Sequence, residues 1–308
     1  MSISVGGFML AQAASSRTSL NVLASVAFVA VVLGGVAGVI PPRRVAGPVR
    51  IPDESPALPL ATVLFGSFGF YLFSYLALAQ FWPTISSRFG LGDPDLMHSE
   101  IGVAISSCLP PIVGLIGMWV GDRAVFPVVH QRLGMGLSLV PVGLLRGILA
   151  AAIVMPLMFL AEDITEFVYQ ASHFQHPAEH PLLKAMGESP SLFVRGALIV
   201  GATVIAPLWE ESFFRGHVQT LLRRMFSRLL GGKTSNPHES MSAWLSIIIT
   251  AAMFAMLHDA WTWPIIFLLA LCLGYAYERT GNLWISITIH SAFNCISTLL
   301  FLFGAGAN

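Results

Sequence analysis

Long apolar segments recur along this chain, and they constrain its fold more than any other feature. A helix needs about 20 consecutive apolar residues to cross a hydrocarbon core of about 30 Å. Charged residues make up only 10% of the sequence, against about 25% in an ordinary soluble domain. A water-soluble fold would therefore lack the polar groups to cover its surface. The sequence predicts an all-α, polytopic membrane helix bundle.

Eight segments are expected to be transmembrane helices. They are residues 20–40, 58–82, 101–120, 147–161, 196–209, 243–257, 261–276 and 283–303. The first is interpreted as a retained span, because it is too long for the apolar region of a signal peptide and is followed by Arg43 and Arg44. An even number of spans places both termini on the same side of the membrane.

The basic residues predict the orientation. Of the 16 Lys and Arg residues, 12 fall on alternate connections and four on the opposite side. Since positively charged connections stay in the cytosol, both termini are expected outside, in a plasma (inner) membrane. The net charge is zero, which argues against a nucleic-acid partner.

Charged residues interrupt the fifth apolar segment at Glu210, Glu211 and Arg215. A charge at membrane depth is costly, so such residues point to function. On a continuous helix, Glu211 and Arg215 lie at i and i+4 and are expected to form an ion pair. Glu210 points about 100° away from Glu211 and is left for chemistry. The alternative is that the span ends at Trp209 and both glutamates lie in solvent.

Two later segments carry histidines on polar stripes. Phe254 and His258 lie four residues apart near the end of one segment, and His290 and Asn294 lie four residues apart on the last one. His290 and Asn294 are expected to point at the same atom, since they are one helical turn apart. The alternatives are a satisfied structural histidine at position 258 and a hydrogen-bonded seam between helices at 290 and 294.

The three motifs together resemble those of the CPBP family. This family comprises the type II, Rce1-like CAAX prenyl proteases and their bacteriocin-processing and self-immunity relatives. The matching motifs are Glu-Glu-x-x-x-Arg, Phe-x-x-x-His and His-x-x-x-Asn, at Glu210–Glu211–Arg215, Phe254–His258 and His290–Asn294. The resemblance divides the chain into an N-terminal membrane region of about four helices, residues 1–190, with no family motif, and a CAAX-protease-like catalytic membrane domain, residues 191–308.

The resemblance implies an intramembrane endopeptidase whose active-site cavity opens to the cytosol. Glu210 is expected to be the general base that activates water, with His258 as its partner. His290 and Asn294 are expected to stabilise the oxyanion. Structural support is assigned to Glu211, Arg215 and Phe254. The expected partners are a peptide or membrane-protein substrate and the lipid bilayer.

No cofactor is expected, although zinc remains an alternative. Glu210, His258 and His290 are the residue types of a zinc site with an open position, but the His-Glu-x-x-His spacing is missing. Two other functions also remain open, namely a non-enzymatic membrane binding or bacteriocin-immunity protein, and a transporter. The transporter is disfavoured because intramembrane charges occur only in the last third of the chain, not in two halves.

Overall fold

The computed structural model describes residues 57–125, 133–175, 177, 181–230 and 237–304. Every regular element within these ranges is helical. The α-helices are α2 (Ala57–Phe89), α3 (Glu100–Val125), α5 (Val140–Ala171), α6 (Pro181–Glu188), α7 (Leu192–Val200), α8 (Ala206–Glu211), α9 (Thr220–Leu229), α10 (Pro237–Met256), α11 (Trp263–Thr280) and α12 (Leu283–Gly304). Two 3₁₀ turns, η1 (Leu137–Leu139) and η4 (Ala260–Thr262), lead into α5 and α11.

Six helices within the described ranges are long and apolar enough to cross a membrane, which confirms the predicted all-α membrane helix bundle. Two spans are more than twice as long as predicted. The span expected at 147–161 is part of α5 (Val140–Ala171), because Arg146 and the acidic residues after 161 are accommodated within the helix. The span expected to stop at 209 continues to Leu229, so the glutamates do not follow a helix end.

Two predicted spans have a different outcome. Residues 243–257 lie mostly in α10, but its apolar part, Met241–Met256, is shorter than a full crossing. The polar residues 237–240 form the start of that helix instead of extending the apolar stretch. The first predicted span, residues 20–40, lies outside the described residues.

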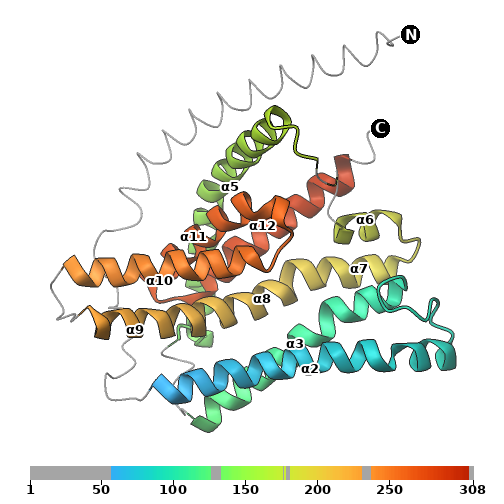
Figure 1. Cartoon of the computed structure of the whole chain (residues 1–308), viewed down its shortest axis with the longest axis horizontal. Coiled ribbons are helices and arrows are strands. Elements are labelled where there is room, and N and C mark those ends of the chain that lie inside the picture. Colours follow the sequence, from blue (N-terminus) through green and yellow to red (C-terminus); the bar gives the residue numbers. More distant parts are fainter. Residues whose placement is uncertain (1–56, 126–132, 176, 178–180, 231–236, 305–308) are drawn as a thin grey trace.

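One nearly continuous rod carries the first motif (Figure 1). It runs from α7 through η2 (Gly201–Ile205) and α8, then through η3 (Ser212–Gln219) into α9. Both η2 and η3 are π-helical. The short α8, which ends with Glu210 and Glu211, therefore lies between two π segments. Such segments are rare and occur frequently at functional sites.

Helices from both sides of residue 190 pack against each other. α2 and α3 form an antiparallel hairpin, and α3 lies along α7, η2 and α8. α5 packs against α11 and α12. Gly143 and Gly147 let α12 approach closely, because a Cβ at these positions would collide with Trp284 and Thr288 respectively. Small residues spaced in this way are typical of close helix pairs in membranes. The division at residue 190 stays a prediction of the sequence pattern.

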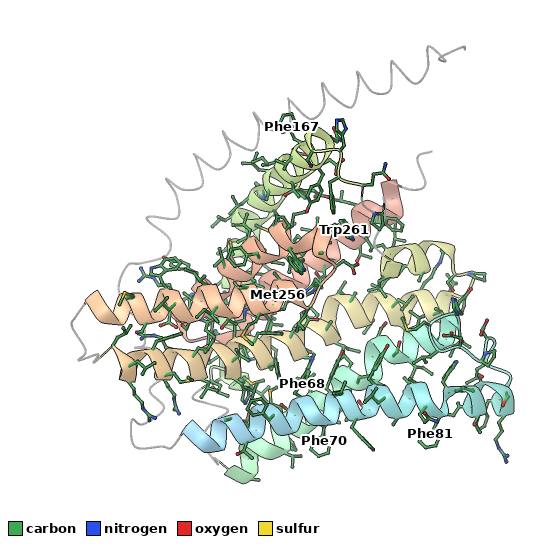
Figure 2. All side chains as sticks on the ribbon, viewed as in Figure 1. Phe68, Phe70, Phe81, Phe167, Met256 and Trp261 are labelled. Carbon is green, nitrogen blue, oxygen red and sulfur yellow. The ribbon has the colours of Figure 1, made fainter. Side chains whose placement is uncertain are left out.

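The outer surface of the bundle is apolar, as expected for contact with lipid. Phe70 and Phe81 of α2, Phe167 of α5 and Met256 of α10 are all more than half exposed (Figure 2). In water such a surface would be an aggregation hazard, whereas in a bilayer it is the solvated face. The chain is an integral, multi-pass membrane protein.

Candidate functional site

The first motif folds around a buried ion pair. Arg215 Nη1 donates a hydrogen bond to Glu211 Oε1 at 2.8 Å, and both side chains are fully buried. Arg215 Nη2 also donates to the carbonyl of Ala270 on α11 at 3.1 Å. The predicted i,i+4 pair is therefore present, and it ties the rod to α11. A buried charge pair needs such additional hydrogen bonds to offset its desolvation.

His290 of α12 joins this ion pair. Its Nδ1 lies 2.9 Å from Glu211 Oε1, the same oxygen that Arg215 contacts, and its side chain is 5% exposed. An ionised carboxylate only accepts hydrogen bonds, so Nδ1 carries the hydrogen. The other ring nitrogen, Nε2, is thereby directed toward the remaining glutamate.

Phe254 supports the same cluster from α10. The guanidinium of Arg215 lies 4.7 Å from the centre of its ring, a cation–π contact. The ring also meets the imidazoles of His290 and His258, with centroid separations of 5.8 and 4.8 Å. One buried phenylalanine thus contacts a residue from each of the three motifs.

Glu210 lies at the rim of the cluster. Its Oε2 is 3.7 Å from His290 Nε2, and its side chain is 25% exposed, whereas that of Glu211 is fully buried. The two adjacent carboxylates therefore differ in environment, as the sequence predicted. Glu211 is neutralised by Arg215, while Glu210 lies beyond ordinary hydrogen-bond distance from His290.

His258 follows the end of α10 at Met256. It therefore does not lie on the helix, as the sequence had predicted it would. Its Nδ1 donates to the carbonyl of Phe254 at 2.9 Å, and its own carbonyl accepts a bond from Trp263 Nε1 at 2.9 Å. The imidazole within ion-pair distance of Glu210 is that of His290. His258 and His290 share one feature. In each, Nδ1 donates to an acceptor, which orients the ring and leaves Nε2 for another contact.

Asn294 contacts a different group from His290. Its Nδ2 donates to the carbonyl of Ala202 in η2 at 2.8 Å. In this π segment the amide of Ala206 donates to the carbonyl of Gly201, five residues earlier. The next donor in that series would be residue 207, which is proline and has no N–H. Asn294 therefore supplies the hydrogen bond that Pro207 cannot give to Ala202, and one N–H of its amide remains for another acceptor.

Among the described residues, no group of three or more His, Cys, Asp or Glu side chains is arranged to hold a metal ion. Glu210, His258 and His290 are thus near each other without forming such a group. The zinc alternative and the metal-free expectation both remain predictions.

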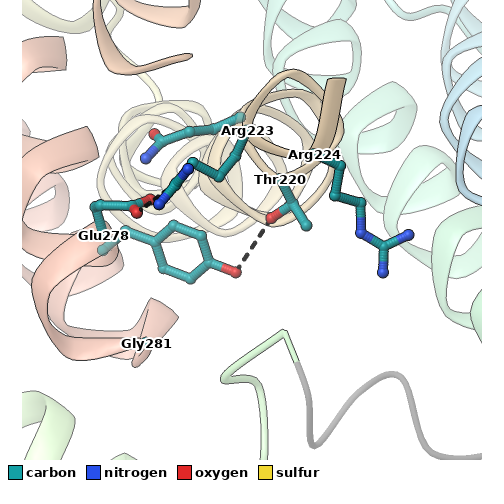
Figure 3. A pocket seen from close by; sticks show the side chains of 7 residues that line it. Thr220, Arg223, Arg224, Glu278 and Gly281 are labelled. Atoms are coloured by element: carbon teal, nitrogen blue, oxygen red, sulfur yellow. Dashed lines mark hydrogen bonds and ion pairs between the residues drawn. The ribbon is translucent and has the colours of Figure 1, made fainter. Parts of the chain in front are cut away.

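A separate small cavity, of about 50 Å³, lies between the rod and α11 (Figure 3). Arg223 Nε donates to Glu278 Oε1 at 2.9 Å beside it, and Thr220 and Tyr277 hydroxyls lie 3.5 Å apart. None of the predicted site residues lines this cavity. Its lining residues are Gln219, Thr220, Arg223, Arg224, Tyr277, Glu278 and Gly281.

The sequence interpretation missed one buried acid–base pair, formed by Asp122 and His217. Asp122 lies two residues past the predicted span 101–120 and therefore in a predicted connection. His217 follows Arg215 by two residues and belongs to none of the three motifs. A signal was present, because His217 lies among Phe213, Phe214 and Val218 on an apolar helix.

These features define a class of protein: a polytopic helix bundle with a carboxylate–imidazole cluster inside its membrane helices. Residues 192–296 match the model of the family described as Type II CAAX prenyl endopeptidase Rce1-like. The chain thus carries a domain of this peptidase family, and the resemblance seen in its motifs is confirmed. The match spans about a third of the chain and includes all seven predicted site residues. Neither curated proteins nor solved structures gave a match.

Proposed function

We propose that the chain is an intramembrane endopeptidase that hydrolyses a peptide bond with a water molecule activated by Glu210. The observation that carries this proposal is the contrast between the two neighbouring glutamates. Glu211 is fully buried and paired with Arg215 and His290, whereas Glu210 is partly exposed beside His290 Nε2. A general base must be accessible to its substrate, and of the two glutamates only Glu210 has a partly exposed side chain.

In the proposed reaction, Glu210 takes a proton from water as the oxygen attacks the scissile carbonyl. The tetrahedral intermediate then collapses with cleavage of the C–N bond, and Glu210 passes its proton to the leaving amine. His258 is proposed as the partner of Glu210, because the bond from its Nδ1 to the carbonyl of Phe254 leaves Nε2 available. The proposed donors to the oxyanion are the second amide N–H of Asn294 and Nε2 of His290, which donates when the imidazole between the two glutamates carries a hydrogen on both ring nitrogens. Donors fixed in advance stabilise developing charge without reorganisation, and both side chains are held by other bonds.

Glu211 and Arg215 are proposed to support the site and not to react. A fully buried pair with three hydrogen bonds around it can position His290 but cannot reach a substrate. The site needs no metal in this scheme. Restoration of chelator-inhibited activity by zinc would contradict that part of the proposal.

The substrate is proposed to be a peptide or a segment of a membrane protein, which reaches the site within the bilayer. The cytosolic side is proposed to be the end at which α2 begins, α3 ends and α9 ends (Figure 1). Arg223, Arg224 and Arg228 lie on α9, and Arg123 lies near the end of α3. This gathering of arginines supports the orientation expected from the positive-inside rule, in a plasma membrane with both termini outside.

A comparison of protein termini tests the proposal. Membranes from cells expressing the wild-type chain or the Glu210→Gln variant at equal levels are labelled at free amino termini and analysed by mass spectrometry. New termini that depend on the wild-type chain are expected, and they would identify the substrate. Identical termini in both samples would contradict peptidase activity and favour a non-enzymatic binding or immunity role.

A further inference from the structure

Asp122 and His217 form a completely buried pair outside the cluster described above. Asp122 Oδ1 lies 3.0 Å from His217 Nε2, and both side chains are 0% exposed. Asp122 belongs to α3 and His217 to η3, so the contact joins the N-terminal region to the rod that carries Glu210. An ionisable pair at this depth is costly unless its hydrogen bonds are satisfied.

The hydrogen-bond partners of His217 define where a proton must lie. Its Nδ1 is 2.9 Å from the carbonyl oxygen of Ser212. A carbonyl only accepts, so Nδ1 must carry a hydrogen. In a neutral ring Nε2 would then have only a lone pair, and it would face a carboxylate oxygen. A proton must therefore lie between Nε2 and Asp122, on one atom or the other.

The pair acts at a specific point of the rod. Ser212 directly follows Glu211 and is the first residue of η3. The hydrogen bond from His217 Nδ1 holds the carbonyl of Ser212. α3 also contacts the rod just before the glutamates. Gly114 lies so close to the Trp209 indole that a Cβ there would come within 2.6 Å of the ring. Helix α3 therefore contacts the rod on both sides of Glu210 and Glu211.

We propose that Asp122 and His217 are a proton-sharing positioning pair, through which α3 fixes the π turn that follows the two glutamates. The pair touches neither substrate nor water of the reaction and acts through the carbonyl of Ser212. It assigns a role to the N-terminal region, which carries no family motif. The effect on catalysis rests on the proposed peptidase function, whereas the placement of the proton does not.

Four variants separate positioning from stability. Asp122→Leu and His217→Phe each break the Asp122–His217 contact while its other member stays buried, and both are expected to lower the unfolding temperature and kcat. The double variant Asp122→Leu/His217→Phe removes both groups, so its unfolding temperature is expected to be higher than that of either single variant. Its kcat is expected to stay roughly 10²-fold low with little change in KM, because Ser212 is no longer held and shifts of about 1 Å cost that much. Wild-type kcat in the folded double variant would overturn the proposal.

Asp122→Asn is the conservative test. An asparagine amide donates to a neutral Nε2 and needs no shared proton, so this variant is expected to restore most of the kcat lost in Asp122→Leu. A loss as large as that of Asp122→Leu would contradict the hydrogen-bond assignment. The matched control is Asp95→Asn, in an exposed Asp95–His98 pair 3.2 Å apart, for which no change in kcat is expected.

Nitrogen-15 NMR of histidine-labelled protein tests the proton without any substrate. The resonances of His217 are identified by their loss in His217→Phe. Nδ1 is expected to be protonated, and the Nε2 signal is expected to shift in Asp122→Leu. An unprotonated Nδ1 would overturn the proposal even in an active enzyme. Conversely, the expected spectrum in a protein that cleaves nothing would refute only the peptidase function.

Discussion

Glu211 and His290 are 79 residues apart in sequence, yet His290 Nδ1 lies 2.9 Å from the same carboxylate oxygen that accepts a hydrogen bond from Arg215. One buried oxygen thereby joins the rod to α12, while Arg215 joins it to α11. The imidazole is oriented by this contact, so the position of His290 Nε2 beside Glu210 depends on Glu211.

Glu211→Gln is therefore expected to destabilise the protein strongly. The substitution leaves the buried Arg215 without a countercharge, and breaking a buried pair in this way costs about 3–5 kcal/mol. The unfolding temperature in detergent micelles measures the effect. Glu210→Gln is the matched control at the adjacent position, and it is expected to lower that temperature much less. Equal losses in the two variants would contradict the assignment of different roles.

Asn294 and Pro207 are expected to depend on each other. Asn294→Ala removes the donor to the partly buried carbonyl of Ala202, which costs up to about 1–3 kcal/mol. Pro207→Ala supplies the missing N–H, so the same substitution is expected to destabilise much less in that background. Unfolding temperatures of the two single variants and the double variant measure the coupling.

The same pair of variants separates two roles of Asn294. If the second N–H of the Asn294 amide binds the oxyanion, Asn294→Ala is expected to lower both stability and activity. Pro207→Ala is then expected to restore the stability but not the activity. Recovery of both would show that Asn294 acts only on the helix. An equal loss of stability in both backgrounds would contradict the hydrogen-bond replacement.

The close crossing of α5 and α12 gives a packing prediction. Gly147→Leu is expected to destabilise the protein by at least about 1–3 kcal/mol, the usual cost of overpacking, because even a Cβ collides with Thr288. Gly66→Leu on α2 is the control, since nothing lies within 4 Å of a Cβ there. A similar unfolding temperature for both variants would contradict the packing of these two helices.

The connection between α2 and α3 gives a pH prediction. The backbone N–H of Met97 donates to Asp95 at 2.8 Å and, with a smaller contribution from His98, lowers the pKa of Asp95 below its ordinary value of 3.8. Because the pKa of Asp95 is lower in the folded protein than in the unfolded chain, the ionised carboxylate stabilises this turn at pH values above about 3.8. That stabilisation is lost as the pH falls through the folded pKa.

Carbon-13 NMR of the Asp95 carboxyl measures this titration. A midpoint below 3.8 is expected, and most of the shift is expected to persist in His98→Ala, since the backbone bond is the larger cause. A midpoint at or above 3.8 would contradict the described turn.

Local geometry explains which parts of the site the sequence predicted. The Glu211–Arg215 pair depends only on the i,i+4 spacing of one helix, so it was predictable. The contact of His290 with Glu211 and the contact of Asn294 with Ala202 depend on how α12 crosses the rod, which no local pattern specifies. The π segments were also not predictable, since periodicity in sequence cannot distinguish one extra residue per turn.

The fold was predictable for a different reason. Apolar length alone defines a membrane helix, and six such helices are present among the described residues. The predicted bounds of two helices were wrong because polar residues occur near the helix ends. α5 contains Arg146 near its start, and α10 begins with polar residues. Asp122 was missed in the same way, since a carboxylate just past an apolar segment gives no sign that a histidine on another helix covers it.

The claim that Glu210 activates the water is tested most directly with purified protein in lipid vesicles. The substrate is one whose cleavage in cells depends on the wild-type chain. Glu210→Gln keeps the shape of the side chain and removes the base. We expect the variant to unfold near the wild-type temperature and to cleave roughly 10²–10⁴-fold more slowly, the usual contribution of a general base. A folded Glu210→Gln protein that cleaves at the wild-type rate would show that Glu210 does not activate the water.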